Sequence, residues 1–388
     1  MKRRPRILLT GTMAARPYAG GNTWAFLQWV LGFQRLGLET FFVEEIRRED
    51  IVDDTGQATR LATSVNARYF GEVAAAFDLG GRVALLERGG PGHVGLSRTE
   101  VEALAPSVDG FLNQYGRATW LLPLIKGCRV YWDTDPGYTQ VWQEAYDVDM
   151  GLRDHDMYLT VGLGVGRPGC PLPTAGVSWE TTLWPVVVSE WSTSRPAGDT
   201  YTTIADWRGF GAVEWRGVWY GQKADEFRRI VDLPRRVRVP LELCLAIHPE
   251  DPDRVELDRH GWRVIPARRR AGTPAAYRDY VLSSRGEFTC VKGICAAGQI
   301  GWIGDRTACY LAGGRPAIVQ STGIERYLPT GDGLLTFSSL EGAVAAIDRV
   351  ESRYAQHAEA ARVLAREHLD SDKVLGRLGR LIGVSRRP

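Results

Sequence analysis

Short apolar runs alternate with helical patterns along this 388-residue chain, and this alternation limits the possible fold more than any other feature. Near the start, an apolar run at residues 6–10 precedes a helical pattern that begins around Asn22, and a second apolar run follows at 40–44. Parallel strands need a crossover connection, so this strand–helix–strand order is typical of a parallel sheet. The sequence therefore predicts an α/β protein.

The alternation stops at residues 192–200, which read Ser-Thr-Ser-Arg-Pro-Ala-Gly-Asp-Thr and are interpreted as a linker. Further strands are predicted at 108–111, 128–132, 157–161 and 185–188 before it, and at 201–204, 239–246, 263–265, 288–291 and 316–319 after it. Helices are predicted at 223–231, from Gly304, and over most of 340–381. This order predicts two α/β domains, 1–191 and 201–369, and a helical tail at 370–388 that packs back across both. Ligands of open α/β sheets lie beyond the carboxyl ends of the strands, so a shared cleft is expected.

The composition excludes several classes of protein. The formal net charge is only +2, so no overall field attracts nucleic acid, and no window of about 18 apolar residues predicts a membrane span. The apolar run behind the basic N-terminus is too short for a signal peptide. Six cysteines without metal-ligand spacing predict reduced thiols, no metal site and a cytoplasmic location.

The most informative segment is 298–323, which reads as a glycine-rich loop, a helix, a Gly-Gly-Arg-Pro turn, a buried strand and a polar loop. A helix N-terminus behind such a loop presents N–H groups and a positive dipole end, which suit a diphosphate. The residues predicted to bind a diphosphate here are Gly304, Asp305, Arg306 and Thr307. The residues predicted to contact the hydroxyl groups of the moiety attached to the diphosphate are Gln320, Ser321, Thr322 and Gly323. The alternative is that these glycines merely begin and end an ordinary helix.

Residues 302–316 read W-I-G-D-R-T-A-C-Y-L-A-G-G-R-P, and an apolar strand follows. This segment resembles the donor-binding core of GT-B nucleotide-sugar glycosyltransferases, in particular the bacterial natural-product type. The resemblance implies two Rossmann-like domains facing each other across a cleft, with the sugar donor bound mainly by the second domain and a small-molecule acceptor mainly by the first. Paired glutamates or a His and a Glu, which mark many such families, are replaced here by Gly301 and Cys309. Inversion or retention of the sugar configuration is therefore left open.

Four further residues are candidates for donor binding. Lys223 follows Tyr220-Gly221-Gln222 and begins a predicted helix, where the resemblance implies a basic residue that meets the diphosphate. Lys292 follows a predicted strand. Gly20 and Gly21 lie between the first strand and helix, where the resemblance implies that backbone approaches the donor phosphates. A solvated lysine and a simple turn are the alternatives for Lys223 and for the glycines.

A general base must lie within hydrogen-bond reach of the acceptor hydroxyl. Asp135 is the first candidate and Asp133 the second, because both follow the predicted strand at 128–132. The alternative is that one of them only caps the turn at Pro136-Gly137. His155 is a third candidate, since its acidic neighbours Asp154 and Asp156 are expected to orient the imidazole and raise its pKa.

These observations predict a glycosyltransferase that moves a sugar from a UDP- or TDP-sugar to a hydroxyl of a small molecule, with a specialised metabolite as one candidate acceptor. No metal and no cofactor besides the donor are expected, and no nucleic acid partner. A nucleotide-sugar epimerase of the same fold and a non-catalytic nucleotide-sugar-binding protein are the alternatives. A homodimer is one candidate for the oligomeric state.

Overall fold

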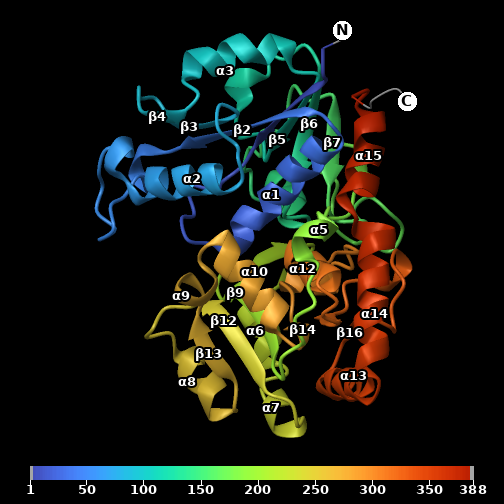
Figure 1. Cartoon of the computed structure of the whole chain (residues 1–388). Helices are drawn as coiled ribbons and strands as arrows, with labels where there is room; N and C mark the ends of the chain where they lie inside the picture. Colours follow the sequence, from blue (N-terminus) through green and yellow to red (C-terminus); the bar gives the residue numbers. More distant parts are fainter. Residues whose placement is uncertain (1–2, 385–388) are drawn as a thin grey trace. The chain divides into compact units, whose positions relative to one another are not determined.

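The computed structural model describes residues 3–384, and the chain divides into two compact units (Figure 1). Of the described residues, the first unit comprises 3–134, 149–159 and 371–384, and the second comprises 135–148 and 160–370. Met1, Lys2 and the end of the predicted tail, 385–388, lie outside the described residues. The segment predicted as a linker, 192–200, lies inside the second unit, and the predicted tail from Ser371 onward belongs to the first.

The first unit is built on a mostly parallel sheet with strand order β4-β3-β2-β1-β5-β6-β7. Its strands are β1 (Arg6–Thr10), β2 (Glu39–Ile46), β3 (Val83–Glu87), β4 (His93–Gly95), β5 (Gly110–Gln114), β6 (Cys128–Asp133) and β7 (Met157–Thr160, whose last residue belongs to the second unit). Its helices are α1 (Gly20–Arg35), α2 (Val65–Ala76), α3 (Arg98–Leu104) and α15 (Ser371–Leu381). The short strand β4 pairs antiparallel with β3, whereas β1 pairs in parallel with β2 and β5.

The C-terminal helix α15 packs against α1 within the first unit, although more than 300 residues separate them along the chain (Figure 1). Gly32 of α1 leaves no room for a side chain, because an added Cβ would lie 2.5 Å from Leu375 and 2.9 Å from Ser371. Arg35 pairs with Asp372 at the edge of this contact. Helix α15, which lies within the predicted helical tail, is therefore part of the first unit's structure.

The second unit is built on a fully parallel sheet with strand order β13-β12-β9-β14-β15-β16. The strands of this sheet are β9 (Tyr201–Asp206), β12 (Leu241–Ala246), β13 (Arg263–Pro266), β14 (Gly286–Thr289), β15 (Ala317–Gln320) and β16 (Leu334–Phe337). Outside this sheet, the unit contains the short strand β8 (Trp179–Thr181) and the antiparallel hairpin of β10 (Val213–Trp215) and β11 (Val218–Tyr220). Its helices are α4 (Tyr138–Ala145), α5 (Val188–Trp191), α6 (Lys223–Arg228), α7 (Leu233–Arg236), α8 (Pro252–Arg259), α9 (Ala267–Ala271), α10 (Pro274–Ser283), α11 (Gly293–Ala297), α12 (Asp305–Ala312), α13 (Leu340–Ser352) and α14 (Tyr354–Leu364).

An aromatic row supports α6 on one face of this sheet. Trp207, which follows β9, packs on Phe227 of α6 with ring centroids 5.4 Å apart, and Phe227 packs on Trp262 at 5.7 Å. Trp262 in turn packs on Phe288 of β14 at 6.1 Å. All four side chains are at most 1% exposed, so burial of these rings fixes α6 against the sheet and thereby positions its first residue, Lys223.

Several predicted boundaries differ from the structure; for example, α6 ends at Arg228 and not at 231, and β14 spans Gly286–Thr289 and not 288–291. Helix α1 begins at Gly20 with Ala19 as N-cap, two residues before the predicted cap Asn22, whose side chain instead donates to the Thr12 carbonyl. The predicted strand at 185–188 is not a strand, since Val186 makes only an isolated bridge to Asp370 and α5 begins at Val188. Within residues 3–384, no helix has both the length and the apolar character that crossing a membrane requires.

Candidate functional site

The strand order of the second sheet reverses between β9 and β14, and ligands of open α/β sheets bind at the carboxyl ends of the strands at such a point. Three predicted cations gather there. The charges of Arg306 and Lys292 both act on Lys223, and so do the carboxylates of Asp206 and Glu287, which lie on β9 and β14. The sheet topology therefore brings together residues that are far apart in the sequence.

Lys223, the first residue of α6, is the least compensated of the three cations. Its pKa is lowered from 10.5 to about 8, mainly by burial and then by repulsion from Arg306 and Lys292, while the charges of Asp206 and Glu287 oppose the shift. Among the described residues, Lys223 forms no hydrogen bond or ion pair. A partly buried ammonium without an ion pair, beside two further cations, is a group that an anion would stabilise.

Lys292, which follows β14, is already paired. Its ammonium donates to Asp135 Oδ1 at 2.7 Å, and both side chains are about one quarter exposed, at 25% and 28%. The same ammonium lies 4.2 Å from the ring centre of Phe210 and 5.0 Å from that of Tyr138. The structure thus joins a predicted phosphate ligand directly to the predicted general base.

The N-terminus of α12 carries no side-chain cap from its N-cap residue, Gly304. The Asp305 carboxyl lies at this end, where burial raises its pKa while the Arg306 charge and first-turn N–H groups lower it. Within the described residues, the buried hydroxyl of Thr307 has no hydrogen-bond partner. The Asp305 carboxyl already accepts from N–H groups of the first turn, so the Thr307 hydroxyl is the polar group at this end that a ligand could satisfy.

The Arg306 side chain points into the sheet. Its Nε donates to Glu287 at 2.6 Å, Nη1 donates to the Ile204 carbonyl at 2.5 Å, and Nη2 donates to Thr289 Oγ1 at 3.0 Å. Glu287 is fully buried and requires a countercharge, which explains why an arginine lies here. A phosphate contact by Arg306, as predicted, would therefore compete with three existing bonds.

Arg306→Met is expected to reduce the free energy of unfolding by about 3–5 kcal/mol, because it leaves the Glu287 carboxylate buried without a partner. Urea unfolding would measure the loss. The matched control is Arg235→Met, since Arg235 pairs with Asp232 on the surface and exposed pairs contribute about 0–1 kcal/mol. Equal losses in the two variants would contradict the buried-pair interpretation.

The predicted polar loop after β15 is largely occupied by contacts within the protein. Gln320 accepts from the Val291 N–H at 3.1 Å and donates to Glu226 at 2.6 Å, and the Thr322 hydroxyl bonds both the N–H and the carbonyl of Trp302. Gly323 adopts a φ of 78°, where an added Cβ would lie 2.2 Å from the Arg326 guanidinium. These residues fix the loop against α6 and against the segment before α12.

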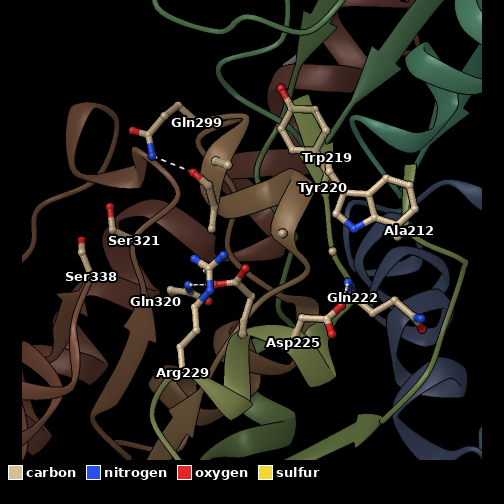
Figure 2. A pocket seen from close by; sticks show the side chains of 15 residues that line it. Ala212, Trp219, Tyr220, Gln222, Asp225, Arg229, Gln299, Gln320, Ser321 and Ser338 are labelled. Atoms are coloured by element: carbon tan, nitrogen blue, oxygen red, sulfur yellow. Dashed lines mark hydrogen bonds and ion pairs between the residues drawn. The ribbon is translucent and has the colours of Figure 1, made fainter. Parts of the chain in front are cut away.

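A pocket of about 530 Å³ adjoins this loop in the second unit. Figure 2 shows Gln299, Ser321 and Ser338 on one side of it and Trp219 with Gln222 on the other. Its further lining residues are Ala212, Tyr220, Gly221, Asp225, Glu226, Arg229, Gly293, Ala296, Ala297 and Gln320. Trp219 is 66% exposed, so its aromatic ring is accessible to solvent in a pocket that amide, hydroxyl and carboxylate groups also line. Among its lining residues, Gln320 and Ser321 belong to the predicted set.

In the first unit, Gly20 and Gly21 form the first turn of α1 and not a loop. The chain before them is held by Glu44 of β2, whose carboxylate oxygens accept from the N–H groups of Ala14 and Ala15 at 2.7 and 2.6 Å. Burial raises the pKa of Glu44 to about 7, while these N–H groups oppose the shift. Glu44 was not predicted, although an acid inside an apolar strand was its signal in the sequence.

The predicted bases Asp133 and His155 belong to the first unit, whereas Asp135 belongs to the second. Asp133 ends β6 and is fully buried. His155 Nδ1 lies 3.1 Å from the Leu152 carbonyl and Nε2 lies 3.1 Å from the Asn113 amide nitrogen, so both ring nitrogens have partners. Burial lowers the pKa of His155, opposite to the predicted direction, because desolvation outweighs the charge of Asp154.

Comparisons with known proteins agree with the fold. No protein-family model matches the sequence, and no curated protein does. An alpha-glucosyltransferase in complex with UDP and a 13-mer DNA containing an HMU base matches with a TM-score of 0.58 and 10% identity, over 99% of this chain and 100% of that one. An alpha-glucosyltransferase in complex with UDP matches with a TM-score of 0.57 and 10% identity, over 98% and 100%.

A third solved structure that is similar is AviGT4, a glycosyltransferase involved in Avilamycin A biosynthesis. It matches with a TM-score of 0.53 and 10% identity, over 98% of both chains. At such low identity, these matches establish the fold and not the activity. The predicted GT-B fold class, and with it the resemblance to GT-B glycosyltransferases at the level of the fold, is confirmed.

Proposed function

We propose that this protein is a glycosyltransferase that moves a sugar from a UDP- or TDP-sugar to a hydroxyl of a small-molecule acceptor. The observation that carries the proposal is the unpaired Lys223 ammonium, which lies at the switch point of the second sheet near Lys292 and Arg306. A diphosphate is a ligand of the right charge for this place. The UDP bound by the alpha-glucosyltransferase neighbour and the shared fold support this choice of ligand.

The proposed reaction follows from these charges. The acceptor oxygen attacks the anomeric carbon of the sugar, a base takes the hydroxyl proton, and the bond between the sugar and the diphosphate breaks. Negative charge then grows on the leaving nucleoside diphosphate, where Lys223, Lys292 and the start of α12 would stabilise it. Because these groups supply positive charge, we expect no requirement for a divalent metal. The polar pocket beside Trp219 offers partners for sugar hydroxyls.

The acceptor class is proposed from the charge of the chain. A formal charge of +2 gives no general attraction for a polyanion, so a small molecule is favoured over nucleic acid. A neighbour of the same fold was nevertheless solved with DNA, and DNA therefore belongs among the acceptors to be tested. A cytoplasmic location is proposed because all six cysteines are unpaired thiols.

Calorimetric titration with UDP and with TDP, in the presence of EDTA, tests the donor assignment. We expect saturable binding of at least one of the two nucleotides, with an affinity that EDTA does not change. Absence of binding would contradict the donor assignment, and binding that EDTA abolishes would contradict the metal-independent form of it.

Product analysis with UDP- and TDP-sugars then separates the alternatives. Transfer to a hydroxylated small molecule supports the proposal, and transfer to DNA would correct the acceptor class. Conversion of the donor without any acceptor would indicate an epimerase. Tight donor binding with neither transfer nor hydrolysis would indicate a non-catalytic binding protein.

A further inference from the structure

The pair between Lys292 and Asp135 connects two residues that the proposed reaction uses separately. Lys292 is a candidate ligand of the diphosphate, and Asp135 is the candidate base for the acceptor hydroxyl. The ammonium lies 2.7 Å from Asp135 Oδ1, so the carboxylate has an oxygen occupied by this bond. A substrate hydroxyl that approaches this oxygen has to share it with the ammonium, which occupies one of its lone-pair positions.

The surroundings of Lys292 favour a change of partner over a fixed pair. The rings of Phe210 and Tyr138 lie 4.2 and 5.0 Å from the ammonium and attract it whichever anion it contacts. These two rings pack on each other with centroids 5.2 Å apart, and Trp142 packs on both. The aromatic cluster therefore keeps the lysine in place without depending on Asp135.

The charges around the switch point favour the same exchange. Glu287 compensates Arg306 through a buried bond of 2.6 Å, and Asp135 compensates Lys292 from a partly exposed position. Lys223 remains without an ion-pair partner among residues 3–384 and is repelled by the other two cations. An arriving diphosphate carries more negative charge than one carboxylate and is attracted by Lys223 as well as by Lys292, so it is the stronger partner for Lys292.

We propose that Asp135 and the donor diphosphate compete for the Lys292 ammonium, so that donor binding releases the Asp135 carboxylate. This inference rests on the proposed function for the identity of the anion. Its consequence is an ordered reaction: the acceptor hydroxyl loses its proton to Asp135 only after the leaving group is in place. The pair thus engages one oxygen of the base for as long as the enzyme holds no donor.

Calorimetric titration with UDP at pH 7 tests the competition in four proteins: the wild type, Asp135→Asn, Lys292→Met and the double variant. Asp135→Asn is expected to bind UDP about tenfold more tightly, because the competing carboxylate is gone. Lys292→Met is expected to bind about tenfold more weakly, since one charged contact is lost. The double variant is expected to bind UDP as weakly as Lys292→Met, because removing Asp135 cannot help when the ammonium for which it competes is absent.

The control for a general change of charge is Asp279→Asn. Asp279 is a surface carboxylate, 65% exposed, that lies 3.8 Å from Arg195, and its loss is expected to leave UDP affinity unchanged. The proposal is overturned if Asp135→Asn binds UDP no more tightly than the wild type, or if its gain persists when Lys292 is methionine. The first result would show that Asp135 holds Lys292 in place and does not compete with the donor for it. The second would show that the gain in UDP affinity comes from removing a negative charge and not from releasing Lys292.

Inorganic pyrophosphate separates failure of this inference from failure of the proposed function. If the wild type binds pyrophosphate but neither UDP nor TDP, the donor assignment fails, while the same four proteins titrated with pyrophosphate still decide the competition. If the wild type binds UDP and the affinities of the four proteins agree within twofold, the competition fails and the donor assignment stands. If the wild type binds neither anion, both are overturned.

Discussion

Asp135→Asn is expected to lower the turnover number by about 10²–10⁴-fold, the usual contribution of a general base, without weakening donor binding. The amide keeps the size of the carboxylate but cannot take the proton of an acceptor hydroxyl. A side chain that only maintained the shape of the site would instead lower affinity and turnover together. Rising donor affinity with falling turnover is thus the distinctive result.

Asp135 is preferred over the two other candidates because of its surroundings. His155 has both ring nitrogens engaged, by the Leu152 carbonyl and by the Asn113 amide. Asp133 is fully buried at the end of β6. The Asp135 side chain is 28% exposed, so among the three it is the one that a substrate hydroxyl can best approach.

Initial rates at saturating donor, with the acceptor varied, would measure this effect in the wild type and in Asp135→Asn. Asp279→Asn again serves as the control, since it removes the same charge from an exposed position and is expected to keep the wild-type rate. A turnover number within threefold of the wild type in Asp135→Asn would exclude Asp135 as the base. His155 and Asp133 would then be the next residues to substitute.

Most strands of the two sheets were predictable because a local apolar run marks each of them, whereas β3, β4 and β16 were not predicted. Each apolar run is short and followed by a turn, and the runs at 6–10 and 201–204 lie in β1 and β9. The helix predicted from Gly304 is α12, and the Gly-Gly-Arg-Pro turn leads into β15 as expected. Short strands were missed: the hairpin of β10 and β11 has only three residues per strand and two exposed positions in β11, so periodicity gave no signal.

The chemistry of the site was less predictable because its pairs join distant residues. Arg306 looked like a phosphate ligand, but Glu287, a charged residue inside an apolar strand, holds it in the sheet. Lys292 and Asp135 are 157 residues apart in the sequence, and no local sequence pattern indicates that they are in contact. His155 has acidic neighbours in the sequence, whereas its pKa is governed mainly by burial, which only the fold determines.

Lys223→Met is expected to weaken UDP binding by about 10- to 100-fold at pH 7, because it removes the charged group that lacks a partner in the described structure. The effect should depend on pH. The pKa of Lys223 is lowered to about 8, so its contribution to binding is complete below pH 8 and is lost as the pH rises above it. The advantage of the wild type over the methionine variant should therefore fall by about tenfold per pH unit above 8 until the two affinities are equal.

Lys223→Arg is the matched control for this pH dependence. The guanidinium stays charged throughout, so the affinity of this variant should not fall between pH 8 and 10 as that of the wild type does. Parallel profiles in the wild type, the arginine and the methionine variants would show that Lys223 does not bind the diphosphate. Titrations at half-unit intervals would resolve the difference.

The same lysine should make the ligand-free protein less stable than it could be. Its pKa of about 8 in the folded protein lies below the ordinary value of 10.5, so the folded state binds fewer protons than the unfolded state between these two values. The penalty for burying the ammonium is therefore present in full below pH 8 and declines as the pH rises toward 10.5.

Lys223→Met should both raise the melting temperature at pH 7 and lower UDP affinity, a combination expected of a residue that is retained for binding and not for stability. A methionine variant that melts below the wild type would show instead that Lys223 contributes to the fold, and its loss of UDP affinity could then no longer be attributed to a lost phosphate contact.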